Sequence, residues 1–156
     1  MRAGYVLALA LVLGWTPLPS SAQGQTWNYS NKADPFTDVL EHGISISNRR
    51  TVLMFLCREG EPLRAALIWA GVRLGARGDI VEVEWRAGRA PSVKSDWKIP
   101  FTGGVVEFDR GREVVATILS EEATSSVFVA RSGGYFMEFD TSGLAQALEE
   151  ITPYCT

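Results

Sequence analysis

The chain has 156 residues, 46% of them hydrophobic, and its 15 basic and 18 acidic residues give a formal net charge of −3. Nucleic-acid binding needs a concentrated basic face, and the arginines here are scattered, so no nucleic-acid partner is expected. The length suits one domain with a substantial hydrophobic core.

The first residues have the layout of a secretory signal peptide. Arg2 gives a basic start, an apolar run extends to Trp15, and two prolines precede small residues ending at Ala22. The apolar run is well short of the roughly 20 residues that a membrane-spanning helix needs. We therefore expect a signal peptide over residues 1–22 and a single β-rich exported domain over 23–156. Its expected localisation is periplasmic or secreted, with no stable membrane span after cleavage.

Most of the exported part predicts β-strands. The clearest is residues 79–86, DIVEVEWR, where Val81, Val83 and Trp85 alternate with charged residues, as in a strand with one wet face. Turn-forming residues between apolar runs predict three hairpins. These hairpins join residues 43–47 to 50–57, 103–109 to 113–120 through Asp109–Arg112, and 126–131 to 135–139 through Ser132–Gly134. Such short strands predict a mainly β fold, an antiparallel sandwich or barrel with a short C-terminal helix.

Residues 62–74 are compatible with either a helix or a strand. Apolar residues recur there at helical spacing, but every second residue from Leu63 to Trp69 would also share one face of a strand. Considered alone, the alanines in this segment favour a helix.

The tail predicts a short helix. Leu144, Ala147, Leu148 and Ile151 share one helical face, and Thr141 or Ser142 is suited to cap the start. Pro153 would stop the helix before the last cysteine.

The chain has two cysteines and one histidine. In an exported protein an even cysteine count indicates a disulfide, and the pairing would be Cys57 with Cys155. The alternative is two unpaired thiols. Two cysteines and one histidine offer too few soft ligands for a closed zinc site, so no metal and no cofactor are expected.

No residue pattern identifies a reaction. His42 stands beside a turn-like glycine and is expected to be a surface or capping residue. Glu82 and Glu84 share the wet face of one strand, as ordinary solvated charges do, and no Gly-x-Ser-x-Gly elbow is present. An enzyme would gather Glu82, Glu84 or Asp79 in a cleft with aromatics such as Trp69 or Trp97. An inhibitor or immunity-type partner would expose a loop wedge at residues 86–92 or 132–134.

The order of motifs resembles a small exported family of type VI secretion-associated proteins of proteobacteria. That family has an early Trp, a (Ser/Asp)-Pro-x-x-Asp box, a Cys after a strand, and a Phe-x-x-Ser-Gly-Leu-x-x-Ala-Leu segment before a second Cys. The residues that fill this pattern here are Trp27, Asp34, Pro35, Asp38, Cys57, Phe139, Ser142, Gly143, Leu144, Ala147, Leu148 and Cys155.

The resemblance implies a β-rich accessory domain without known catalytic residues, and it favours a strand over residues 63–71. We therefore expect a non-catalytic periplasmic binding or accessory protein that is associated with a type VI secretion system. Its partner would be a protein or an envelope component. The alternative is a small envelope enzyme that acts on glycan or peptide.

Overall fold

The computed structural model describes residues 25–33 and 37–156. The expected signal peptide lies outside these residues, as do Asp34 and Pro35 of the family box. The described chain is mainly β, as predicted, and has two helices. The strands are β1 (Asn28–Ala33), β2 (Leu40–Asn48), β3 (Thr51–Arg58), β4 (Arg64–Trp69), β5 (Ile80–Ala87), β6 (Val93–Lys98), β7 (Val105–Phe108), β8 (Val127–Ser132) and β9 (Tyr135–Asp140), and the helices are α1 (Gly111–Glu121) and α2 (Leu144–Glu149).

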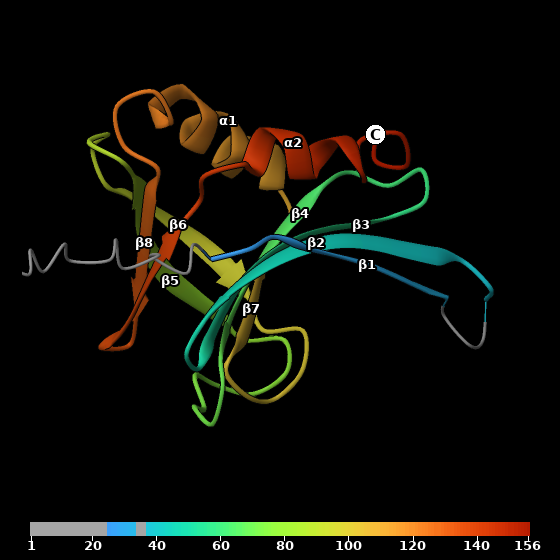
Figure 1. The fold of residues 1–156 in the computed structure, drawn as a ribbon. Coiled ribbons are helices and arrows are strands. Elements are labelled where there is room, and N and C mark those ends of the chain that lie inside the picture. The colour runs from blue at the N-terminus through green and yellow to red at the C-terminus, as the bar shows by residue number, and fades with distance from the viewer. Residues whose placement is uncertain (1–24, 34–36) are drawn as a thin grey trace, which may run out of the picture.

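The strands form one nine-stranded sheet in the order β1-β2-β3-β4-β7-β6-β5-β8-β9, with antiparallel pairing throughout. The sheet bends so that its two halves enclose one hydrophobic core, and α1 and α2 lie together across one end (Figure 1). The end of β2 approaches the edge strand β9, where Asn48 Nδ2 donates to the Glu138 carbonyl at 2.8 Å.

Two predicted hairpins and the alternating strand are confirmed. β2 pairs with β3 across a turn in which Arg49 has a φ of 55°. β8 pairs with β9 across Gly133 and Gly134, whose φ angles of 54° and 84° suit glycine. On β5 the side chains of Val83 and Trp85 are buried, while the charged residues between and beyond them face outward.

The third predicted hairpin is wrong, because residues 113–120 belong to helix α1. Val114 and Ile118 are buried one helical turn apart, and Val115 and Leu119 pack beside them. The β-branched residues favoured a strand, but packing against β4 and β5 overrides that local preference. Gly111 allows this contact, since a Cβ there would lie 2.5 Å from the carbonyl carbon of Arg64.

The ambiguous segment contains strand β4, so the helical alternative is wrong. β4 lies between β3 and β7 in the middle of the sheet. Ala65 and Leu67 are fully buried on the core face, and Ala66 on the other face is only 3% exposed. Because both faces of β4 are largely covered, its sequence is a continuous apolar run rather than an alternation.

The tail helix is present and α2 packs as expected. Leu144 and Ile151 are fully buried, and Ala147 and Leu148 pack partly buried against the core. The predicted caps are wrong, because Gly143 occupies the N-cap position with a φ of 78°. Thr141 instead donates its hydroxyl to the carbonyl of Ser126 at 2.7 Å.

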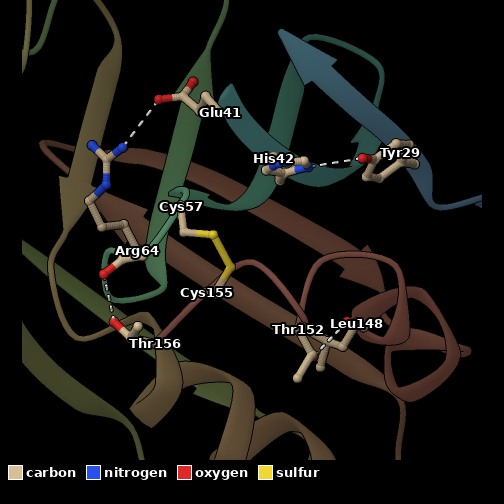
Figure 2. The surroundings of a disulfide bond; sticks show 10 residues. Tyr29, Glu41, His42, Cys57, Arg64, Leu148, Thr152, Cys155 and Thr156 are labelled. Atoms are coloured by element: carbon tan, nitrogen blue, oxygen red, sulfur yellow. Dashed lines mark hydrogen bonds and ion pairs between the residues drawn. A yellow bond between two sulfur atoms is a disulfide. The ribbon is translucent and has the colours of Figure 1, made fainter. Parts of the chain in front are cut away.

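The predicted disulfide is confirmed. Cys57 at the end of β3 is bonded to Cys155, 98 residues later, with the two Cα atoms 5.6 Å apart (Figure 2). The bond fastens the chain beyond α2 to the end of β3. Cys57 is fully buried and Cys155 is partly buried.

Candidate functional site

A hollow lies between the N-terminal arm, residues 25–27, and helix α2. We call it the arm groove. It has a volume of about 700 Å³. Its lining residues are Gln25, Thr26, Trp27, Tyr29, Ile44, Ser142, Gly143, Gln146, Ala147 and Glu150. The groove therefore combines two aromatic rings, two side-chain amides, hydroxyls and one carboxylate.

The arm is held against the segment before α2 by two hydrogen bonds. The Trp27 indole donates to the carbonyl of Ser142 at 3.1 Å, and the Asp140 backbone N–H donates to Gln25 Oε1 at 2.9 Å. The Trp27 ring also packs against Phe55 of β3, with the ring centres 6.1 Å apart. Both hydrogen bonds join residues 115 positions apart in the chain, and together with the Phe55 contact they place Trp27 in the wall of the groove.

Asp140 fixes the other wall. The Ser142 hydroxyl donates to Asp140 Oδ1 at 2.6 Å, and the Ser142 backbone N–H donates to the same oxygen at 3.0 Å. These two hydrogen bonds hold the pKa of Asp140 below its ordinary value, because they favour the ionised carboxylate. The charged form of Asp140 thus orders the turn that accepts the Trp27 indole.

His42 packs next to the groove residue Tyr29. The prediction that His42 is a surface or capping residue is wrong. It lies on β2 and is 1% exposed. Its Nδ1 is hydrogen-bonded to the Tyr29 hydroxyl at 3.0 Å (Figure 2). Its ring stacks on Tyr154, with the ring centres 3.7 Å apart. Because Tyr154 precedes the disulfide-bonded Cys155, the tail, His42 and the groove residue Tyr29 form one packed unit.

The family-motif residues separate into two groups. Trp27, Ser142, Gly143 and Ala147 line the arm groove. Phe139 and Leu144 are fully buried, and Leu148 packs against the same core. Asp38 lies apart from the groove, in the turn before β2, with a φ of 55°.

Sequence reasoning missed several polar lining residues of the groove, among them Gln25, Gln146 and Glu150. Gln146 and Glu150 are four residues apart and exposed near α2, so they fall on the same side of that segment. Their spacing was visible in the sequence, but nothing there showed that Trp27 and Tyr29 lie opposite.

The carboxylates considered for catalysis are not gathered in one cleft. Glu82 pairs with Lys94 at 2.8 Å, and Glu84 pairs with Arg131 at 2.6 Å, both on the outward face of β5. Hydrogen bonds from Arg131 and then Ser92 lower the pKa of Glu84. Asp79 accepts the Ala76 backbone N–H in the loop before β5. Trp69 and Trp97 are buried in the core, away from these charges.

Among the described residues, no group of three or more His, Cys, Asp or Glu side chains is arranged to hold a metal ion. Neither α1 nor α2 is long and apolar enough to cross a membrane. Comparison of the chain with protein-family models, with curated proteins and with solved structures found no match.

Proposed function

We propose that the protein is an exported, non-catalytic binding protein whose arm groove holds a peptide segment of a protein or envelope partner. The observation that carries this proposal is the lining of the groove. Trp27 and Tyr29 offer broad, rigid contact surfaces, and aromatic rings of this kind contribute strongly to interfaces.

The polar lining matches a peptide main chain. Gln25, Gln146 and Ser142 carry groups that both donate and accept hydrogen bonds, as the alternating N–H and C=O groups of a peptide require. Glu150 is the one acidic or basic residue in the lining, so the groove favours a neutral or basic segment over an acidic one.

The arrangement of reactive groups supports binding rather than catalysis. Ser142 donates its hydroxyl to Asp140 rather than to an imidazole, and the Nδ1 of His42 is engaged by Tyr29. A nucleophile needs an adjacent base that can accept its proton, and the lowered pKa of Asp140 makes that carboxylate a weak base. Glycoside hydrolysis uses a pair of carboxylates, and Glu150 is the one carboxylate among the lining residues of the groove.

The proposed setting is the periplasm or the extracellular space, and a type VI secretion system is the proposed context. The disulfide fits an oxidising compartment. The layout of residues 1–22 supports cleavage of a signal peptide, and the motif resemblance supports the secretion context. Deletion of the gene should then reduce secretion by that system, and normal secretion in the deletion strain would remove this context.

The groove is tested with a matched pair of variants. Ala147 lines the groove, whereas Ala145 lies on the exposed side of the same helix. Random peptides displayed on phage are selected on the folded protein, and the enriched peptides are titrated by calorimetry. We expect Ala147→Trp to abolish binding by filling the groove and Ala145→Trp to leave it unchanged. Equal binding by both variants would place the ligand elsewhere.

A further inference from the structure

A second surface, at the start of the edge strand β9, is distinct from the arm groove. Phe136 is 59% exposed there, on the outward face of β9. A hollow lies on each side of Phe136, one of about 400 Å³ toward the β2–β3 turn and one of about 310 Å³ over β5 and β8. Neither hollow shares a lining residue with the arm groove.

Each hollow contains two arginines. Arg49 and Arg50 line the first and Arg86 and Arg131 line the second. Arg131 is paired with Glu84, but Arg49, Arg50 and Arg86 form no ion pair within the part of the chain that the structure describes. The hollows also contain Glu138 and Glu84, so arginines outnumber carboxylates on a chain whose formal net charge is −3.

The main chain of Phe136 faces the free edge of the sheet. The Glu138 carbonyl accepts Asn48 Nδ2 and the Asp140 N–H donates to Gln25, so the main-chain groups of these two residues point to the free edge. Since main-chain direction alternates along a strand, the N–H and C=O of Phe136 point the same way. They have no hydrogen-bond partner among residues 25–33 and 37–156.

The two edges of the sheet differ in how they are protected. Edge strands normally carry lysine, proline or other features that prevent pairing with another chain. β1, with the sequence NYSNKA, contains Lys32 and is exposed and mostly polar along its length. β9, with the sequence YFMEFD, has neither lysine nor proline and begins with two exposed aromatic residues.

We infer that the start of β9 is a docking site for an extended acidic segment of a partner protein. The main chain of the partner segment pairs with that of Phe136, and one of its apolar side chains packs on the Phe136 ring. The carboxylates of the segment enter the two arginine hollows. Because both hollows adjoin Phe136, a segment of a few residues spans them. A second copy of this chain fits less well, since it would bring Arg49 and Arg50 against arginines of the same kind. An anionic lipid would leave the main chain of Phe136 unpaired.

The test uses short blocked peptides and the purified, disulfide-bonded protein. The probe alternates glutamate and valine. One control peptide has lysine in place of glutamate, and another is N-methylated at alternate main-chain nitrogens. We expect the glutamate peptide to bind and both control peptides to bind at least about tenfold more weakly, because one lacks the charge and the other the pairing.

Charge-reversed variants locate the site. Arg49→Glu/Arg50→Glu and Phe136→Ser should each weaken binding of the glutamate peptide by about tenfold or more. Lys32→Glu/Arg112→Glu makes the same change of net charge elsewhere, and Phe101→Ser removes another exposed ring, so both should bind as the unmodified protein does. Circular dichroism of every variant checks that it is folded.

Three results would overturn the inference. The first is no binding of the glutamate peptide, or equal binding of its N-methylated form. The second is a dimer in sedimentation that the Arg49→Glu/Arg50→Glu variant abolishes, which would make a second copy the occupant. The third is binding to phosphatidylglycerol vesicles that the same variant abolishes, in the absence of peptide binding. Peptides selected on the arm groove are unaffected by these variants, so the two sites are tested separately.

Discussion

Loss of the disulfide should destabilise the fold by about 2–5 kcal/mol, whichever cysteine is replaced. The bond closes a loop between residues 98 positions apart. In the chain-entropy model a loop of about 100 residues contributes about 4.7 kcal/mol, and measured values are commonly lower. Cys57→Ala and Cys155→Ala are the variants to compare, because alanine leaves no buried hydroxyl without a partner at position 57.

The remaining contacts of the tail are few. The buried side chain of Ile151 and the stack of Tyr154 on His42 hold it from one side. Two main-chain hydrogen bonds, from Gly60 N–H to the Tyr154 carbonyl and from Thr156 N–H to the Glu61 carbonyl, hold it from the other. A six-residue helix such as α2 is not stable alone, so the tail depends on these contacts once the bond is lost.

Urea unfolding followed by tryptophan fluorescence gives the free energy of each variant. We expect the double variant to be no less stable than either single variant, since one replacement already removes the bond. Reduction of the unmodified protein should lower its stability by a similar amount. Additive losses in the double variant would contradict the reasoning, as would two free thiols per chain in the denatured, unreduced protein.

Three other predictions follow from the fold and the site. Ala116→Asp should lower stability by no more than about 1 kcal/mol, because Ala116 is exposed on α1 and only helix propensity is lost. Ile118→Asp should prevent stable folding, because Ile118 is buried. A strand would bury both residues, so equal losses in urea unfolding would contradict the helix. The lowered pKa of Asp140 contributes stability at pH values above the ordinary carboxyl pKa, and this stability is lost as the pH falls through the folded-state pKa. Below about pH 4 the unmodified protein should therefore lose more stability than the Asp140→Asn variant. Identical dependence of stability on pH in the two proteins would contradict this role of Asp140. Mass spectrometry of the exported protein should find Gln23 at its N-terminus, and an intact Met1 in a membrane pellet would refute the signal peptide.

Local sequence pattern was sufficient where one strand face meets water and where a turn has distinctive residues. The alternation of β5 and the glycines between β8 and β9 are of this kind. Local sequence pattern failed for α1. Val114, Val115 and Ile118 favour a strand locally, but packing against β4 and β5 determines the helix. β4 was ambiguous because a central strand does not alternate.

The arm groove could be predicted only in part. The motif resemblance singled out Trp27 and Ser142, but their contact joins the two ends of the chain and no local pattern encodes it. His42 was placed at the surface because Gly43 follows it, yet Gly43 lies inside β2 and the imidazole packs under Tyr154. Both outcomes depend on how the edge strand and the tail meet, which is a property of the whole sheet.

The most direct test of a binding function is the indole N–H signal of Trp27 in ¹⁵N-labelled protein, recorded as a peptide selected on the arm groove is added. Trp27 lines the groove, whereas Trp69 is buried and the indoles of Trp85 and Trp97 both donate to Ser95 inside the protein. We predict that the Trp27 signal shifts strongly, that the signals of the other three described tryptophans barely move, and that the peptide is recovered intact. A static Trp27 signal at saturation, or cleavage of the peptide, would contradict the account.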